Sequence, residues 1–307
     1  MRRALVLAGL AACDTSVSNT RLPGATTLTD VTNVDGQSWF LVTSRAGAAA
    51  TICKLVEHDL ACSTIPNSAS GVALVEAGSG ATPLLAIPSP RGTVYLEPFT
   101  WRTVRELEGV AYDEPAVILN NRTLWVAQAL NVLIAPADRE RHSAFVTKTV
   151  GVSLSPTGVL WTERRIPGEV ASTVVMSAPL EPDRLGLPRT HPLDPWRLAD
   201  LAHRLLCRVG SMVAVRLEDD RDAMFDLTTD QVVRVSNGGE NATSWCRPDF
   251  VDDRVIEPER RGLGLPRAAE ITNGKLFVYP TGEVVVLDRA DRAKPIALRW
   301  LGMPFAW

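Results

Sequence analysis

The chain has 307 residues, with 32 Lys or Arg against 35 Asp or Glu, and its formal net charge is −3. Binding to nucleic acid depends on clustered basic residues that neutralise phosphates, so this mildly acidic balance argues against a nucleic-acid partner. The length suits two ordinary domains or one large all-β domain.

The N-terminus has the layout of an export signal. Arg2 and Arg3 precede a short apolar run, and small residues then lead to a cysteine in Leu10-Ala11-Ala12-Cys13. This order of features is that of a secretory signal, and the run is too short to cross a bilayer as a helix. The last four residues also resemble the lipobox of bacterial lipoproteins, in which the cysteine sulfur receives the lipid. An ordinary secretory signal is the alternative.

The lipobox resemblance implies a signal peptide over residues 1–12, a lipidated Cys13 and a linker over residues 13–24. The protein would then be anchored to a membrane of the bacterial cell envelope through its lipid. Asp14 resembles the residue that favours inner-membrane retention in many enterobacterial lipoproteins. We therefore expect a chain that faces the periplasm from the inner membrane, with the cell surface as the alternative.

Five cysteines, less the lipidated one, leave four that can pair in an oxidising compartment. A two-residue turn at Glu57-His58 would place Cys53 opposite Cys62 at a non-hydrogen-bonded position of a hairpin, where the Cα atoms are about 4.5 Å apart. That separation suits a disulfide. Elimination then pairs Cys207 with Cys246. Metal binding is the weaker alternative, because the cysteines form no close cluster.

Short apolar runs rich in β-branched and aromatic residues predict strands along most of the chain. Turn signals such as Asp35-Gly36, Asn120-Asn121 and Asn273-Gly274 separate them. The clearest predicted strands cover residues 38–43, 93–96, 123–127, 158–162, 212–217 and 275–279. One segment differs, because its apolar residues recur at helical spacing after Asp194 and Pro195, and we expect a short inserted helix near 194–203.

An internal repeat indicates the architecture. The segment from Glu181 to Arg189 recurs, with two residues inserted, from Glu257 to Arg267, and Leu96-Glu97-Pro98 is a fainter copy. The copies are spaced at about twice the ~40-residue period of a propeller blade. Four short predicted strands over residues 204–235 would make up one such period, which corresponds to one blade. The chain thus resembles a β-propeller, which we expect as a single domain over residues 25–307.

Dividing the mature length by the size of a blade gives six or seven four-stranded blades, and we favour seven. A pair of β-sandwiches divided near residue 150 is the alternative fold. It would account for the strands and leave the repeat unexplained.

The common catalytic and phosphate-binding motifs do not occur in the sequence, and we assign no catalytic residue. A Ser/His/Asp set assembled from distant residues stays open. We also expect no cofactor. Calcium at acidic loops is the alternative, because hard cations prefer oxygen-rich loops. Two loops supply such acids: Glu218, Asp219, Asp220 and Asp222 in the first, and Asp249, Asp252, Asp253 and Glu257 in the second.

The eight tryptophans fall into two groups. Trp39, Trp125 and Trp161 lie inside apolar strands and are expected in the core. Trp101, Trp196 and Trp245, with Asp220, Asp222, Asp252 and Asp253, are the candidate residues for contact with a partner. The apolar C-terminus is expected to close the ring against the N-terminal blade, because an exposed apolar tail favours aggregation.

Together these features predict a non-catalytic binding or scaffolding module with an envelope protein as its partner. The alternative is a propeller-type enzyme, a lyase, lactonase or glycosidase, that uses the loop carboxylates with or without calcium. Such an enzyme would bring at least two of those carboxylates into one concave pocket and shift the pKa of one of them.

Overall fold

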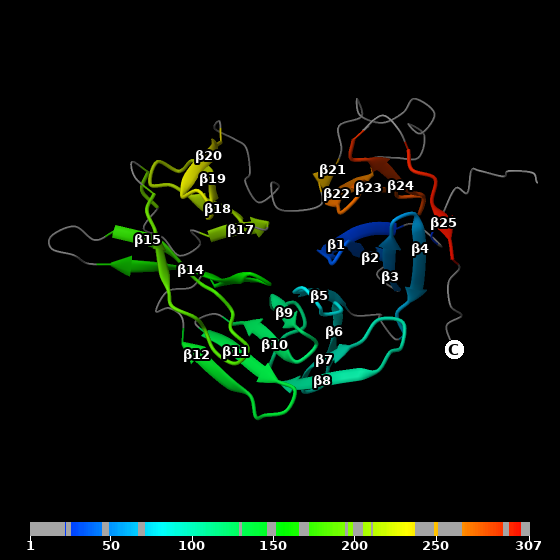
Figure 1. Cartoon of the computed structure of the whole chain (residues 1–307), viewed down its shortest axis with the longest axis horizontal. Helices are drawn as coiled ribbons and strands as arrows, with labels where there is room; N and C mark the ends of the chain where they lie inside the picture. Colours follow the sequence, from blue (N-terminus) through cyan, green and yellow to red (C-terminus); the bar gives the residue numbers. More distant parts are fainter. Residues whose placement is uncertain are drawn as a thin grey trace, which may run out of the picture.

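The structure is a computed structural model that describes residues 22, 26–44, 49–66, 71–128, 131–145, 152–165, 172–193, 196–198, 205–209, 211–236, 249–250, 266–290 and 295–301. These residues form β-strands, turns and irregular segments, and no helix. Figure 1 shows the strands gathered into small sheets that follow one another in chain order around a ring.

The first half of the chain forms three antiparallel units of four strands. The first contains β1 (Thr26–Val34), β2 (Gln37–Ser44), β3 (Ala50–Val56) and β4 (Asp59–Thr64). The second contains β5 (Ala73–Ala77), β6 (Leu84–Ser89), β7 (Gly92–Leu96) and β8 (Thr103–Glu108). The third contains β9 (Ala116–Leu119), β10 (Thr123–Ala127), β11 (Asn131–Pro136) and β12 (His142–Phe145).

The second half forms three more units and one closing strand. The fourth unit contains β13 (Ser153–Ser155), β14 (Gly158–Arg165), β15 (Ser172–Ala178) and β16 (Arg189–His191). The fifth contains β17 (Leu205–Val209), β18 (Met212–Arg216), β19 (Asp222–Asp226) and β20 (Gln231–Val235). The sixth contains β21 (Asp249–Phe250), β22 (Arg267–Ile271), β23 (Gly274–Val278) and β24 (Val284–Asp288), and β25 (Arg299–Trp300) follows it.

The second and third units are joined into one eight-stranded sheet, because β5 pairs in parallel with β9 through Glu76↔Val117 and Ala77↔Ile118. This arrangement of four-stranded units around a ring is a β-propeller, as the repeat predicted. The alternative of two β-sandwiches is wrong. The described residues form six such units rather than the favoured seven, because their first strands begin 37 to 52 residues apart, at residues 26, 73, 116, 153, 205 and 249. Several units are therefore longer than the ~40-residue period from which seven was estimated.

The hydrophobic core lies between neighbouring sheets. In β2 the side chains of Trp39 and Leu41 pack toward the second sheet, and those of Phe40 and Val42 pack toward the sixth. All four are buried, because a propeller sheet is covered on both faces. Trp125 and Trp161 are also buried, as predicted, in the cluster that joins the third and fourth sheets.

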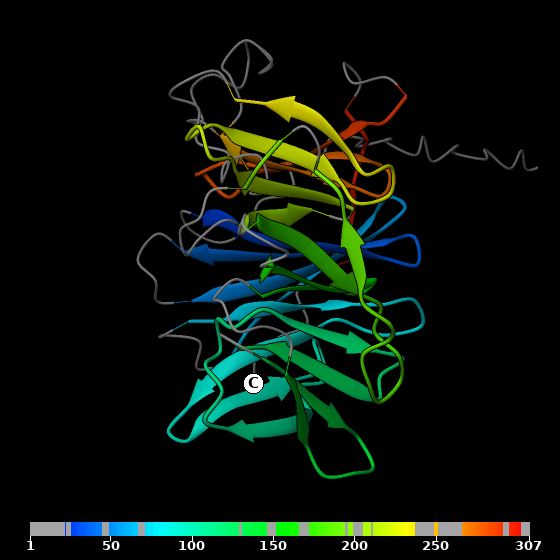
Figure 2. The same ribbon diagram turned by 90° about the vertical axis from the view of Figure 1, so that its left-hand side faces the viewer.

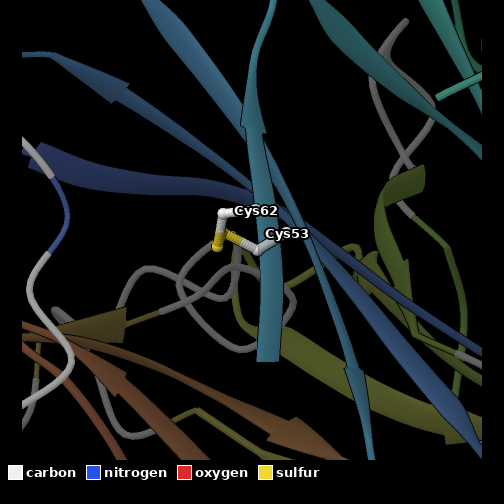
Figure 3. The surroundings of a disulfide bond; sticks show 2 residues. All are labelled: Cys53 and Cys62. Atoms are coloured by element: carbon white, nitrogen blue, oxygen red, sulfur yellow. A yellow bond between two sulfur atoms is a disulfide. The ribbon is translucent and has the colours of Figure 1, made fainter. Parts of the chain in front are cut away.

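The predicted hairpin disulfide forms between β3 and β4 (Figure 3). Val56 faces Asp59 across the Glu57-His58 turn, and Cys53 faces Cys62 with a Cα–Cα distance of 4.1 Å. Glu57 has a φ of 53°, which closes the two-residue turn. The other predicted pair lies outside the described residues, because Cys246 and the Cys207 side chain are not among them.

Replacing both Cys53 and Cys62 by alanine should lower the free energy of unfolding by about 2–3 kcal/mol, since a cross-link over a short loop restricts the unfolded chain. Urea unfolding, followed by tryptophan fluorescence, measures this loss. The Cys207→Ala/Cys246→Ala variant under the same oxidising conditions serves as the comparison. An unchanged urea midpoint in the Cys53/Cys62 variant would contradict the prediction.

The ends of the described chain fasten the sixth sheet to the first. β25 pairs in parallel with β4 through Arg299↔Asp59 and Trp300↔Leu60, which covers the outer edge of the first sheet. Near the N-terminus, Leu22 is buried between these two sheets, and its N–H donates to the Gly282 carbonyl. The prediction that the C-terminal segment pairs with the N-terminal blade is confirmed for the described residues.

The pair between Arg299 and Asp59 gives this closure a pH dependence. The Arg299 guanidinium hydrogen bonds to the Asp59 carboxylate, at 2.6 Å from Nε to Oδ1, and lowers the pKa of Asp59. We expect Arg299→Gln to raise that pKa toward its ordinary value in an NMR titration, and Arg289→Gln to leave it unchanged. The pairing contributes above the ordinary carboxyl range and is lost as the pH falls through the lowered pKa. An Asp59 pKa that is the same in Arg299→Gln as in the wild type would contradict the prediction.

The predicted helix near 194–203 is wrong where the structure describes it. Residues 196–198 are irregular and not helical: Leu198 bridges to Leu217, and the Glu218 N–H donates to the Arg197 carbonyl. Leu198 is 2% exposed against the fifth sheet. Burial against a neighbouring sheet therefore decides the conformation here, and the helical spacing of the apolar residues does not.

The repeat marks equivalent places two sheets apart. Leu96-Glu97-Pro98 begins at the last residue of β7 and Leu180-Glu181-Pro182 follows β15, and both strands are third in their units. In each copy the glutamate accepts from an arginine of the same loop, Arg102 or Arg184. In both copies the repeat therefore encodes a loop between the third and fourth strands that a Glu–Arg ion pair holds together. Most of the third copy lies outside the described residues.

Candidate functional site

The acidic loop between β18 and β19 does not form a carboxylate pocket. Glu218 and Asp220 are exposed, and Asp219 pairs with Arg221, which lowers the pKa of Asp219. Asp222 is 3% exposed and pairs with Arg216 across the hairpin. Asp222 therefore forms a structural ion pair with Arg216 and is not the exposed contact residue that we expected.

The predicted contact tryptophans are partly withdrawn from solvent. Trp101 is half-buried against the core of the second sheet, in a loop where it adopts a φ of 56°. Trp196 is half-buried beside the fifth sheet, and the Arg221 guanidinium lies 5.3 Å from its ring centroid. Neither is the freely exposed ring that its loop sequence suggested.

The remaining predicted site residues are outside the part of the chain that the structure describes: Cys13, Trp245, Asp252, Asp253 and Glu257, together with the Asp249 side chain.

A Ser/His/Asp set, which sequence reasoning had left open, assembles between the fourth and fifth sheets. The Ser177 Oγ lies 2.7 Å from His191 Nε2, and His191 Nδ1 lies 2.6 Å from Asp230 Oδ1. Arg189 also pairs with the other Asp230 oxygen. Because a carboxylate only accepts, Nδ1 carries the hydrogen toward Asp230, and in this tautomer of the neutral ring Nε2 would accept the Ser177 hydroxyl hydrogen.

Strand register explains why these residues meet. In the β15–β16 pair, Val175 faces His191 and Ser177 faces Arg189, so all four side chains point to the same side of the fourth sheet. That side packs on the fifth sheet, since Val175 belongs to the cluster between the two sheets. Asp230 reaches it from the turn before β20, where its φ is 54°.

The set has the hydrogen-bond order of a nucleophilic triad, in which a histidine takes the proton of a serine hydroxyl. Such a serine also needs a substrate pocket and donors for the oxyanion. The adjoining cavity, of about 200 Å³, is lined by Trp196, Phe225 and Asp230 but not by Ser177 or His191 among its described residues. His191 is 2% exposed, and its ring meets Phe225 edge-on at 6.1 Å.

Similar polar contacts join other neighbouring sheets. Asp35 in the β1–β2 turn accepts from the Ser79 hydroxyl at 2.8 Å and from the Gly80 N–H at 2.7 Å. Between the third and fourth sheets, Arg139 pairs with Asp183 at 3.2 Å. The set around His191, whose ring is 2% exposed, thus belongs to a series of polar contacts between sheets.

Burial raises the pKa of two carboxyl groups. Desolvation raises the pKa of Asp30, although its carboxylate accepts from the Leu74 N–H at 3.2 Å. Desolvation also raises the pKa of Glu114. Asp30 lies in β1 and Glu114 in the loop before β9, and neither lines the cavity beside Asp230 or the larger cavity between the first and sixth sheets. They therefore do not form the paired-carboxylate site that an enzyme of the alternative class would show.

The larger cavity, of about 500 Å³, lies where the first and sixth sheets meet. Its described lining consists of Glu57, His58, Thr272, Asn273, Asp288, Arg289, Ala290 and Ile296. Two turns, the end of β24 and the segment before β25 supply these residues, and most of them are polar. In the described part of the chain no cluster of three or more His, Cys, Asp or Glu side chains is placed to hold a metal ion. No described helix could cross a membrane.

Fold and contacts together define the class of the protein as a β-propeller whose sheets are fastened by polar contacts. No protein-family model and no curated protein matches the sequence. Solved structures with a similar fold include BamB from Moraxella catarrhalis, at 12% identity and a TM-score of 0.36, over 92% of this chain and 77% of that one. AztD from Citrobacter koseri has 12% identity and a TM-score of 0.33, over 91% and 72%.

A further match is KlHsv2 with its loop 6CD replaced by a Gly-Ser linker, at 11% identity and a TM-score of 0.37, over 92% of this chain and 98% of that one. Identities and TM-scores this low carry no information on function.

Proposed function

We propose that the protein is a lipid-anchored envelope protein that acts as a non-catalytic binding or scaffolding module for protein or ligand partners. One observation carries the proposal. Side chains that could do chemistry, such as His191, Asp230 and Asp183, serve as contacts between sheets. A rigid ring of this kind presents many turns to partners without a catalytic set.

The envelope part of the proposal rests on the N-terminus and on the cysteines. Leu10-Ala11-Ala12-Cys13 matches the lipobox pattern, and the buried Cys53–Cys62 disulfide is typical of oxidising compartments. We place the protein at the inner membrane facing the periplasm, on account of Asp14, with the cell surface as the alternative.

A hydrolase that uses Ser177 is the second candidate. The observation that favours it is the pair of short distances, 2.7 Å and 2.6 Å, that link Ser177, His191 and Asp230. Ser177 lines neither of the two cavities described above, and the burial of His191 favours the binding module instead.

Two measurements on the full-length protein test the proposal. Cell fractionation should find the wild type with the membranes and Cys13→Ala released from them. A fluorophosphonate probe, which reacts with activated serines, should not label the wild type. Labelling that disappears in Ser177→Ala and persists in the control Ser143→Ala would replace the binding module by the hydrolase. An unanchored wild type would refute the lipid anchor.

A further inference from the structure

A small cavity lies where the segment that follows the fourth sheet packs on the fifth sheet. Figure 2, which views the ring from the side, shows the fifth sheet (yellow) next to the fourth (green), and their buried side chains form one cluster. The cavity has a volume of about 200 Å³. Its described lining consists of Leu193, Trp196, Phe225, Asp230, Gln231 and Val232.

Trp196 forms one wall of this cavity and is held in place by the protein itself. Its N–H donates to the Leu193 carbonyl at 2.6 Å, and its half-buried side chain packs on the cluster between the two sheets. The Arg221 guanidinium lies 5.3 Å from the ring centroid and is itself bound by Asp219. Arg221 is not among the described lining residues, so the part of the ring that lines the cavity is available to a ligand. A ring fixed in this way loses little conformational freedom on binding.

Asp230 and Gln231 supply the polar groups of the cavity. Asp230 accepts from His191 Nδ1 at 2.6 Å, and its other oxygen pairs with Arg189. The two oxygens of an ionised carboxylate have about four acceptor positions, so about two remain for hydroxyl groups of a ligand. Gln231 is exposed, and its side-chain amide can both donate and accept. These groups suit a ligand that carries several hydroxyl groups.

The charged groups around the cavity compensate one another. Asp230 pairs with Arg189, and Arg221 pairs with Asp219. A cationic ligand would compete with Arg221 for Trp196 and with Arg189 for Asp230, and Asp230 would repel an anionic ligand. The described lining therefore favours a neutral ligand.

The size of the cavity limits the ligand to about one ring. Its volume is below the roughly 300–1,000 Å³ of pockets that hold drug-sized ligands. A pyranose ring carries hydroxyl groups around its edge and C–H groups on its faces. It can therefore bond to a carboxylate and an amide while it packs on an indole ring, and Leu193, Phe225 and Val232 add further apolar surface.

We propose that this cavity binds one neutral sugar ring, which packs on Trp196 and hydrogen bonds to Asp230 and Gln231. This inference rests on the proposed binding function and names the ligand class. The ring belongs either to a free monosaccharide or to the end of a glycan chain, because both present the same groups to the cavity.

Saturation-transfer-difference NMR on the full-length protein in detergent micelles tests the inference. The free probes are glucose, galactose, mannose and N-acetylglucosamine, and an array of immobilised neutral glycans tests the chain end. At least one of these probes should bind saturably. Tetramethylammonium, the probe for a cation site built on the same aromatic ring, should not bind.

Variants of two lining residues locate the binding. Trp196→Ala should weaken it about tenfold or more, because the variant lacks the ring on which the sugar packs. Trp196→Phe keeps an aromatic ring and should stay within about threefold of the wild type. Gln231→Ala should weaken binding about fivefold, the effect of losing one neutral hydrogen bond. Trp101→Ala, at a half-buried tryptophan of the second sheet, is the matched control and should bind like the wild type.

An unfolding temperature near that of the wild type shows that a variant is folded, and Gln231→Ala decides the test if Trp196→Ala does not fold. Binding of a free sugar identifies a monosaccharide site, and binding on the array alone identifies the end of a glycan; both support the inference. Binding that either folded variant leaves unchanged, binding of tetramethylammonium in place of sugars, or no saturable binding of any probe would overturn it while the anchored module stands. A wild-type chain that fractionates away from the membranes would instead refute the lipid-anchored module.

Discussion

Replacing Trp125 by alanine should lower the free energy of unfolding by about 3–5 kcal/mol, the range for removing a fully buried large aromatic side chain. Trp125 is 0% exposed in β10 and packs in the cluster that joins the third and fourth sheets. A propeller sheet is stable only when its neighbours cover it, so a cavity here weakens two sheets at once.

Urea unfolding of the purified protein measures this loss. Trp101→Ala is the matched control. Trp101 is only half-buried, so its replacement should lower the free energy of unfolding clearly less. Trp125→Phe should also cost less than alanine, since phenylalanine refills most of the space and removes an indole N–H that is buried without a described partner. Equal losses for Trp125→Ala and Trp101→Ala would show that Trp125 is not in the core.

Asp230→Ala should destabilise the protein by about 3 kcal/mol, because it leaves the buried His191 ring without its carboxylate acceptor. Most of this loss comes from the ring, which is 2% exposed, since the Arg189 side chain that also pairs with Asp230 is more than half exposed. Asp230→Asn keeps an acceptor oxygen for His191 Nδ1 and should lose only about 1 kcal/mol.

A double-mutant cycle between Asp230 and His191 separates this contact from general damage. The two substitutions Asp230→Ala and His191→Ala should be strongly non-additive, because each removes the same hydrogen bond. Asp59→Ala, in a distant ion pair, should be additive with His191→Ala. Additive losses for Asp230 and His191 would contradict the contact between the fourth and fifth sheets.

Local features of the sequence were sufficient to predict the hairpins and their register. The register that pairs Cys53 with Cys62 followed from counting outward from a two-residue turn, because a turn of fixed length sets strand register. Four strands predicted over residues 204–235 occur as β17–β20 for the same reason. Turn residues and alternation act over short distances, and both are visible in one chain.

The blade count and the helix needed information about packing. Leu198 belongs to a helical pattern in the sequence, yet it is buried and forms a β-bridge with Leu217. Which sheet covers a segment is a tertiary property that periodicity alone does not give. The number of blades depends on the lengths of the connections, which vary along the chain.

The Ser177, His191 and Asp230 set could not be located from sequence spacing. Ser177 and His191 are 14 residues apart, and Asp230 follows 39 residues later on another sheet. The sequence itself offered no signal at His191, because this residue comes to lie beside β15 only in the folded sheet. Only the register of β15 with β16 shows that it faces Ser177's side of the sheet.

The central claim is that this propeller is a lipid-anchored protein of the cell envelope, and intact-mass spectrometry of the membrane-extracted chain tests it most directly. The account predicts a chain that begins at Cys13, carries added acyl mass and has Cys53, Cys62, Cys207 and Cys246 oxidised. A chain that retains Met1, lacks acyl mass and has free thiols would contradict it.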